Sequence, residues 1–389
     1  MRKTLLILAT VLSLFGGADL ARGDTFDTSR ETSANPLRVY YGNGQYKQFT
    51  AKGTDRSLAG TGLIGMVIDC GHYWALNITG GNLHGRINSN AGVAILLNGC
   101  NVVLSNSSSS SNAINGGGGV WIVGPGVLHI DNFAKYAAIG SGNEVTFSLG
   151  AVVGVNQMNG STAIAGYGIN MLASSIHVNA VDGSAFQSDK AGFTISGSIV
   201  TAVSTDSCLK LRKYGPLNVL GSSVNLLSAS GSAIQSGTDT SLSAGYIAVS
   251  SSVFCAAGAT DGIVFHGKAS IGFENVIGAI VGRKSGINNV CSCFIDGGAT
   301  KLWIASNVAC EHKEGEIDPI GILADDTSGG EAIYMPSSSS TFELDAGSVK
   351  LFSPGGTALT VATNIVAGGS LRVESKATYG DFQTLFTAS

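Results

Sequence analysis

The sequence predicts an all-β protein in which a single domain winds into a right-handed parallel β-helix of about eleven or twelve turns. Two observations predict this fold. Alternating apolar residues recur between Gly/Ser turns, and a pair made of a small residue and a large apolar one returns about every 25 residues. Period-two alternation is typical of strands with one buried face. A fixed period is typical of repeat folds, whose turns bury apolar surface only against neighbouring turns.

The returning pair is the strongest indication of a coil. It reads Ala94-Ile95, Ala113-Ile114, Ala138-Ile139, Ala163-Ile164, Ala185-Phe186, Cys208-Leu209, Ala233-Ile234, Ile263-Val264, Ala332-Ile333 and Ala358-Leu359. A propeller blade needs about 40 residues, and a sandwich does not require the same pair in the same place. A coil does, because each turn lays its strands on those of the turn before. Right-handedness follows from the strong preference of parallel connections for that hand.

The strands are expected where apolar alternation flanks a Gly/Ser step. Such stretches are NMLASSIHVNAV (170–181), FTISGSIVTAVS (193–204), LNVLGSSVNLLS (217–228) and FELDAGSVKLFS (342–353). Apart from the N-terminal segment, no window of about a dozen residues has a sustained apolar stripe with the 3.6-residue helical period. Strands and turns, rather than helices, are therefore expected.

The ends of the chain predict its organisation. Arg2 and Lys3 precede an apolar run over residues 5–15 and then small residues, a pattern typical of a cleaved export signal. We expect a signal peptide over residues 1–23, an N-terminal cap over 24–60, the β-helix over 61–375 and a C-terminal tail or cap over 376–389. The protein is then secreted or extracytoplasmic, with no transmembrane anchor.

Composition excludes some partners. The net charge is −4, only 12% of residues are charged, and no basic run could follow a phosphate backbone. Nucleic-acid binding is therefore not expected. The protein is expected to be a monomer.

Seven cysteines in an exported protein raise the question of disulfides. Cys70 and Cys100 stand about one turn apart, so a disulfide between stacked positions and a pair of unpaired buried thiols both stay open. Cys208 fills the small-residue place of the repeat and is interpreted as a core residue.

The densest charge cluster, EHKEGEID (311–318), interrupts the repeat. Glu314, Glu316 and Asp318 could hold calcium, because this cation prefers several carboxylate ligands. A solvated loop is the alternative. No other cofactor is expected.

Residues 182–236 resemble the polygalacturonase-like glycoside hydrolases, in the stretches VDGSAF (181–186), TDSCLKL (205–211) and ASGSAIQ (229–235). The resemblance implies that Asp182 and Asp206 stand at two catalytic acids. Ser207 replaces the second acid of the Asp pair, and the expected His of the third motif is absent. The motifs are therefore incomplete for hydrolysis, which needs an acid and a base.

A lyase is a second enzymatic hypothesis for the same stretch. Lys210 and Arg212 alternate with Leu209 and Leu211, so both cations should point outward from one strand. With Asp206 beside them, they could neutralise a uronate carboxylate.

The rung DGSAFQSDKAGFTISGSIVTAVS (182–204) is also similar to secreted β-helix proteins of the carbohydrate-binding, pectate-lyase-like type. This resemblance implies a non-catalytic protein that binds polysaccharide or cell-surface glycan. Outward aromatics are expected to stack on sugars, and the candidates are Tyr73, Trp74, Trp121 and Trp303, with Lys210 and Arg212 as polar partners. A structural or adhesive surface protein without a sugar ligand is the remaining alternative.

Overall fold

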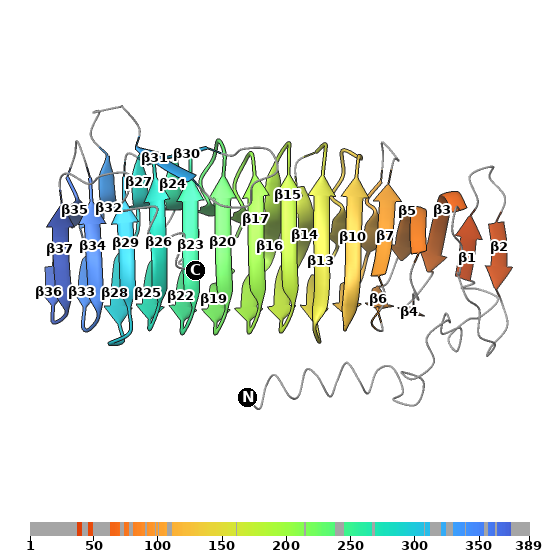
Figure 1. Ribbon diagram of the computed structural model, residues 1–389, viewed down its shortest axis with the longest axis horizontal. Helices are drawn as coiled ribbons and strands as arrows, with labels where there is room; N and C mark the ends of the chain where they lie inside the picture. Colours follow the sequence, from red (N-terminus) through yellow and green to blue (C-terminus); the bar gives the residue numbers. More distant parts are fainter. Residues whose placement is uncertain are drawn as a thin grey trace.

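The computed structural model shows the predicted β-helix. It describes residues 37–40, 46–49, 63–70, 74–77, 81–89, 92–97, 99, 101–106, 111–160, 162–213, 215–237, 245–266, 269–306, 308–311, 320–323, 330–338, 340–353, 357–361 and 364–374. Within these residues there are strands and no helix, arranged as a right-handed parallel β-helix of about 10 turns spaced by roughly 24 residues (Figure 1). The predicted fold class is confirmed. Two parts of the described chain depart from the parallel coil: β1 (Leu37–Tyr40) and β2 (Tyr46–Phe49) pair antiparallel, and β30 (Val308–Glu311) and β31 (Ile320–Leu323) form an antiparallel hairpin.

Each turn of the coil crosses three parallel sheets in a constant order. The first, which we call the short-strand sheet, contains the end of β5 (Gly81–Ser89), β8 (Ile114–Gly116), β11 (Ile139–Ser141), the first parts of β14 (Thr162–Leu172) and β16 (Ser184–Ser196), β18 (Leu209–Leu211), β21 (Ile234–Ser236), β24 (Asp261–Phe265), β27 (Ser285–Asn288), β32 (Glu331–Met335) and β35 (Leu359–Val361). β14 and β16 continue around the corner into the next sheet, so one strand serves two sheets there.

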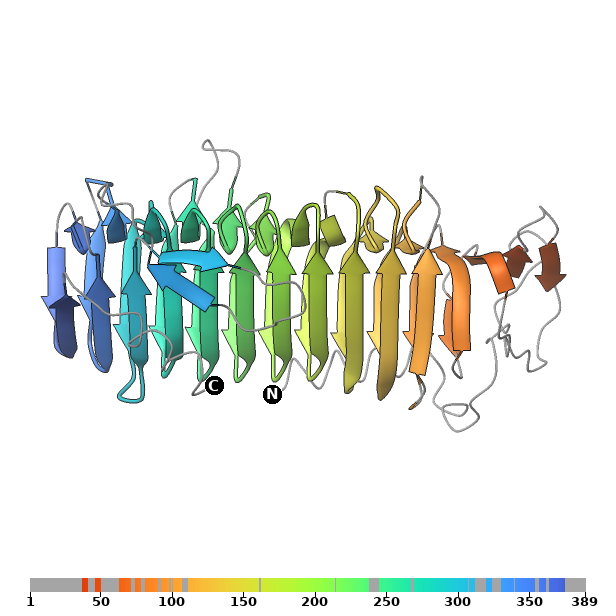
Figure 2. The same cartoon turned by 45° about the horizontal axis from the view of Figure 1, so that its top comes forward.

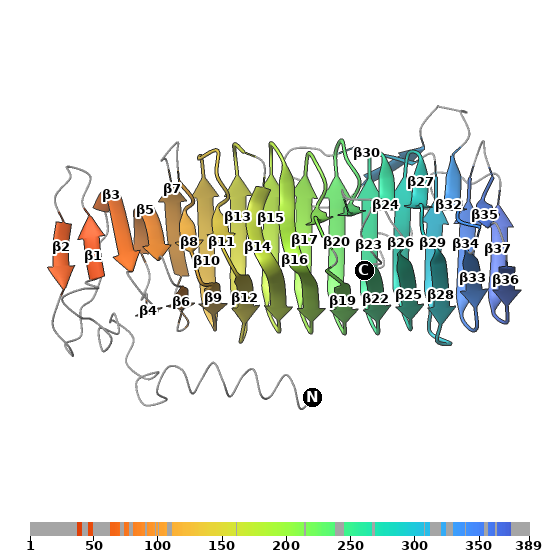
Figure 3. The same cartoon turned by 180° about the vertical axis from the view of Figure 1, so that it is seen from behind.

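The other two sheets complete the turn. The middle sheet contains β4 (Trp74–Asn77), β6 (Val93–Leu96), β9 (Val120–Val123), β12 (Glu144–Ser148), the second parts of β14 and β16, β19 (Leu217–Leu220), β22 (Tyr246–Ser250), β25 (Ser270–Glu274), β28 (Ser292–Asp296), β33 (Thr341–Leu344) and β36 (Asn364–Ala367) (Figure 3). The long-strand sheet contains β3 (Leu63–Cys70), the start of β5, β7 (Asn101–Asn106), β10 (Gly126–Asn132), β13 (Ala151–Gln157), β15 (Ser175–Ala180), β17 (Ile199–Ser204), β20 (Ser223–Ser228), β23 (Val253–Gly258), β26 (Ile277–Gly282), β29 (Lys301–Ala305), β34 (Ser348–Phe352) and β37 (Ser370–Glu374).

The repeated pair forms a column in the short-strand sheet. Its large residues stack from turn to turn and are fully buried: Ile114, Ile139, Ile164, Phe186, Leu209, Ile234, Ile263, Ile287 and Ile333. Stacked strands lie about 4.8 Å apart, so each side chain packs on its equivalents above and below. The column is the core that the periodicity predicted.

Two of the predicted repeats of this pair were assigned wrongly. Ile263 itself fills the large position, so the pair there is Gly262-Ile263 and not Ile263-Val264. A Cβ on Gly262 would lie 2.7 Å from Ile280 Cγ2, so even alanine would clash there. The alanine that marks the other turns is therefore absent from this one. Ala94-Ile95 belongs to the middle sheet, where Ile95 pairs with Ile122.

The Gly/Ser steps form the corner between the middle and long-strand sheets. Gly197 and Gly221 adopt positive φ values of 58° and 55°, which glycine tolerates best. The following serines bridge successive turns, since the backbone N–H of Ser198 donates to Ser222 Oγ at 3.1 Å and that of Ser222 donates to Ser252 Oγ at 3.1 Å. The step is thus a repeated corner that satisfies backbone donors with serine hydroxyls.

The predicted charged interruption coincides with an insertion. β30 (Val308–Glu311) and β31 (Ile320–Leu323) form an antiparallel hairpin that contacts β23 and β26 on the outer side of the long-strand sheet (Figure 2). The outward side chains of this sheet there are apolar and buried, and comprise Leu227, Ala257, Ala279, Val281, Ala305 and Phe352. A surface that would otherwise be exposed is covered in this half of the coil.

Several predictions fall largely on undescribed residues. The predicted signal peptide lies wholly outside the described ranges, as does the tail over 376–389. Of the predicted cap, only β1 (Leu37–Tyr40) and β2 (Tyr46–Phe49) are described, and β1 also pairs antiparallel with β3. Among the residues described there is no helix long and apolar enough to cross a membrane.

The proposed disulfide also lies outside what is described, because Cys100 and the side chain of Cys70 are not among the described groups. Four cysteines whose side chains are described are free: Cys208, Cys255, Cys291 and Cys293. Cys208 is fully buried, as predicted for the small-residue place of the repeat.

Candidate functional site

A groove on the outer side of the short-strand sheet brings the predicted catalytic candidates together. We call it the central groove, and it is lined by Asp182, Gly183, Gln187, Thr205, Asp206, Lys210, Arg212 and Ser230. These residues come from the turns before β16, β18 and β21 and from the strands themselves. Sequence reasoning placed the four charged residues in one stretch of rungs, and the coil brings them onto one face.

Strand alternation explains the direction of the lysine. Leu209 and Leu211 of β18 are buried in the core, so Lys210 between them projects outward. It stacks between Gln187 of β16 and Gln235 of β21. Arg212 directly follows the end of β18, and its exposed side chain lines the same groove as Lys210.

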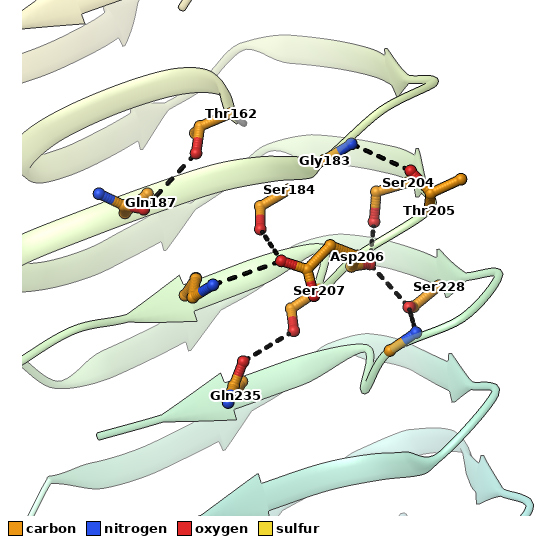
Figure 4. Close-up of polar contacts among 12 residues, drawn as sticks. Thr162, Gly183, Ser184, Gln187, Ser204, Thr205, Asp206, Ser207, Ser228 and Gln235 are labelled. Atoms are coloured by element: carbon orange, nitrogen blue, oxygen red, sulfur yellow. Dashed lines mark hydrogen bonds and ion pairs between the residues drawn. The ribbon is translucent and has the colours of Figure 1, made fainter. Parts of the chain in front are cut away.

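Asp206 is the centre of the polar contacts in this groove (Figure 4). Its Oδ2 accepts a hydrogen bond from Ser184 Oγ at 3.0 Å and lies 3.3 Å from Lys210 Nζ. Burial by itself would raise the pKa of Asp206. The Lys210 ammonium and the hydrogen bonds from Ser184 and from the backbone of Ser207 lower the pKa by more than burial raises it, so it lies below its usual value. The carboxylate is therefore ionised at neutral pH.

The turn that carries Asp206 is fixed by serines from two successive turns of the coil. Ser204 Oγ and Ser228 Oγ donate to the backbone oxygen of Asp206 at 2.6 Å and 2.7 Å. The neighbouring turn is tied to it, since the backbone N–H of Gly183 donates to Thr205 Oγ1 at 3.0 Å. Both acidic turns of the groove are thus held by the scaffold.

A second ion pair lies at the edge of the groove. Arg212 Nη1 lies 3.7 Å from Asp189 Oδ1, and Gln187 Nε2 donates to the same oxygen at 3.1 Å. Both side chains of the ion pair are more than a third exposed, so the pair adds little to stability. Each cation of the central groove therefore has an acidic partner.

The position of the missing second acid has a structural role. Ser207 is buried, and its Oγ donates to Gln235 Oε1 at 3.1 Å. The adjacent thiol is equally inert, because burial raises the pKa of Cys208 to about 12. Neither residue is available for acid, base or nucleophilic chemistry.

This arrangement is suited to binding more than to proton transfer. A general acid needs a raised pKa and a general base is best near the working pH, whereas the pKa of Asp206 is lowered and its charge is paired with Lys210. Carboxylates accept hydrogen bonds, and lysine and arginine donate them, so the groove offers both kinds of partner to a hydroxyl-rich ligand.

Sequence reasoning missed one acid on this face. Asp261, at the start of β24, occupies the position that Ser207 and Ser232 hold in earlier turns, and it is buried. Burial raises the pKa of Asp261, although Asn288 Nδ2 donates to its Oδ1 at 3.0 Å. In the sequence, this acid could have been found as the replacement of a repeated serine by aspartate. It was missed because the repeat was predicted one residue out of register at Ile263.

The two aromatic candidates whose side chains are described, Trp121 and Trp303, do not line the central groove. Trp121 lies on β9 of the middle sheet and Trp303 on β29 of the long-strand sheet. Both side chains face away from the core, as predicted, but they are half-buried, and Lys350 Nζ covers the Trp303 ring at 4.1 Å from its centroid. Tyr73 lies outside the described residues, and Trp74 is described only as backbone of β4.

The calcium hypothesis rests on residues that lie outside the described ranges, namely Glu314, Glu316 and Asp318. Among the residues that are described, no group of three or more His, Cys, Asp or Glu side chains could hold a metal ion.

Comparisons with known proteins add no relative. No family model, no curated protein and no solved structure matches this chain.

Proposed function

We propose that this protein is a non-catalytic β-helix protein that binds polysaccharide through the central groove. The observation that carries the proposal is the Asp206–Lys210 pair, at 3.3 Å, in an open groove that also contains Asp182, Arg212 and hydroxyl and amide side chains. Sugar hydroxyls both donate and accept hydrogen bonds, and this groove supplies acceptors and donors side by side. The predicted export signal would bring the protein to cell-surface or extracellular glycans.

The repeat supports a polymeric ligand. Gln187, Lys210 and Gln235 follow one another in adjacent turns, on strands about 4.8 Å apart. A chain of sugars lying along the coil axis would meet one outward polar side chain in each of these three turns. The resemblance of residues 182–204 to secreted carbohydrate-binding β-helix proteins points the same way.

The test is binding of a polysaccharide panel by the intact protein, followed by calorimetry on the glycans retained. Lys210→Met combined with Asp206→Asn should weaken binding by about tenfold or more, because it removes a charged donor and a charged acceptor. Lys301→Met is the matched control, since Lys301 is an exposed strand lysine on the long-strand sheet. No binding to any glycan would favour the structural or adhesive alternative.

A lyase or hydrolase acting on uronate polymers is the second candidate, and it is favoured by the presence of Asp182 and Asp206 in one groove. Release of reducing ends or of unsaturated uronate products would support it. Such activity, lost in Asp206→Asn and in Lys210→Met, would replace the binding proposal with an enzymatic one.

A further inference from the structure

A second groove lies on the same sheet, nearer the N-terminus. It is lined by Arg86, Asn88, Ser111, Asn112, Asn115 and Tyr136, and we call it the N-terminal groove. In the short-strand sheet, β8, β11, β14 and β16 stand in this order before β18 of the central groove. The two grooves therefore share one face of the coil and are separated by several turns.

Arg86 breaks the repeat in a way that the fold does not require. Ile87 pairs with Ile114 and Ile114 with Ile139, so Arg86 stands in register with Ala113 and Ala138. Those alanines are fully buried, and every later turn also has a small residue there. A cation at a position that holds alanine, glycine or cysteine in the later turns is a local departure of the kind expected at functional sites.

The guanidinium of Arg86 has no acidic partner among the side chains that the structure describes. Its Nη1 donates to Ser111 Oγ, a neutral acceptor, and its Nε has no hydrogen-bond partner. Both cations of the central groove, in contrast, face carboxylates. The N-terminal groove thus has a fixed positive charge that an anion could neutralise.

Asparagine amides line the floor beside Arg86. Asn112 Nδ2 donates to Asn115 Oδ1 at 3.1 Å, and Asn115 Nδ2 donates to Asn88 Oδ1 at 2.9 Å. Gly140 makes room for this chain, because a Cβ there would lie 2.1 Å from Asn112 Nδ2. Each amide has more hydrogen-bonding groups than these contacts use, and those groups are suited to sugar hydroxyls.

Buried amides inside the coil hold the rims of the groove. Asn106 Nδ2 donates to the backbone oxygen of Ser111 at 2.9 Å. Asn132 Nδ2 and Gln157 Nε2 donate to the backbone oxygen of Tyr136 at 2.7 Å and 3.1 Å. The backbone at Tyr136 is thus held by the coil, while the Tyr136 side chain is 54% exposed and accessible to a ligand.

From these features we infer that the N-terminal groove binds a sugar that carries a carboxylate, such as a uronate unit of a polysaccharide. Arginine forms a two-pronged contact with a carboxylate, the asparagines bind hydroxyls, and the tyrosine ring offers a face for the sugar ring. The choice of a sugar rests on the proposed function. The requirement for a carboxylate is new, because the paired charges of the central groove do not impose one.

The test compares an oligogalacturonate with its methyl ester, in which each carboxylate is replaced by an uncharged ester that carries a methyl group, by calorimetry on the full chain. The intact protein should bind the acid about tenfold more tightly than the ester. Arg86→Gln should abolish that preference, whereas Lys301→Gln, which removes an exposed cation of the long-strand sheet outside both grooves, should leave it unchanged. Tyr136→Ala should weaken both oligomers by about threefold to tenfold.

Equal binding of acid and ester by the intact protein, or an unchanged preference in Arg86→Gln, overturns the inference while leaving the proposed function intact. Absence of binding to every polysaccharide overturns the proposed function as well. If Arg86→Gln does not fold, Arg86→Lys keeps the charge but loses the fork geometry, and it should reduce the preference for the acid. An unchanged preference in Arg86→Lys, together with unchanged affinities for both oligomers in Tyr136→Ala, would also refute the site.

Discussion

The two grooves use the same repeating scaffold in opposite ways. In the central groove the charge stands at an outward position, on Lys210, and an acid lies 3.3 Å away. In the N-terminal groove the charge stands on Arg86, at the position where other turns bury a small residue, and its hydrogen-bond partner is the neutral Ser111. The outward side chain of Lys210 is partly exposed, whereas the column that contains Arg86 is fully buried at Ala113 and Ala138.

The two positions differ in how strongly a charge there indicates a function. A charged outward strand is compatible with a plain solvated surface, so Lys210 by itself says little about function. A charge in a column of buried small residues conflicts with packing, and such a conflict calls for a compensating role. The following predictions test the contrast, from the largest expected effect to the smallest.

The largest effect is expected for Ala138→Arg, which places an arginine in the same column as Arg86, two turns further along the coil. Ala138 is fully buried, so the new charge would be desolvated without a partner. We expect a loss of about 4 kcal/mol or more in the free energy of unfolding, measured with urea. Arg86→Ala should change it by less than about 1 kcal/mol. Tolerance of Ala138→Arg would show that the column is not restrictive.

A smaller loss is expected for Asn132→Ala, which interrupts the buried amides behind the N-terminal groove. Asn106 Nδ2 would lose its acceptor at 2.8 Å, and Gln157 Oε1 would lose its donor at 2.7 Å. Each unsatisfied buried group costs about 1–3 kcal/mol. Thermal unfolding should show this loss, and binding at the N-terminal groove should weaken while binding at the central groove does not. Asn225→Ala is the control, because its buried Oδ1 has no hydrogen-bond partner.

A weak coupling is expected between Asp206 and Lys210. The Asp206 side chain is 46% exposed, so solvent screens the pair. A double-mutant cycle with Asp206→Asn and Lys210→Met should give a coupling below about 1 kcal/mol in unfolding experiments. A coupling several times larger would mean that this pair serves the fold, and would remove the distinction between the two grooves.

Opposite pH dependences are expected for the two acids of the short-strand sheet. The pKa of Asp206 is lowered from its usual 3.8, so its stabilising contribution is present above that pH and is lost as the pH falls through the folded-state pKa. The pKa of Asp261 is raised from 3.8, so its contribution is present below that pH and is lost as the pH rises through the folded-state pKa.

The measurement is the free energy of unfolding against pH for the intact protein, Asp206→Asn and Asp261→Asn. The intact protein should lose its advantage over Asp206→Asn in acid, and it should lose stability relative to Asp261→Asn as the pH rises above 3.8. Parallel curves for both variants would contradict the assigned environments.

Much of the coil could be predicted because the pattern that produces it, apolar alternation within a strand, is local and recurs in every turn. The Leu209 and Ile234 positions follow from alternation and period, and both proved to be stacked and buried. The prediction failed at Gly262, where the space left by Ile280 is too small for the alanine that marks the other turns. Alternation gave the outward direction of Trp121 and Trp303, but it does not give the neighbours of a side chain, such as Lys350 over the Trp303 ring.

The order of the amino acids was sufficient to set the fold class, the buried columns and the outward direction of Lys210, because these depend on periodicity within a strand and its neighbours. It was not sufficient to find the N-terminal groove. Arg86, Ser111 and Tyr136 belong to different turns, and only winding the chain brings them to one place. The partners of each charge were likewise decided by stacking between turns, because contacts such as that of Ser184 with Asp206 join residues from neighbouring rungs.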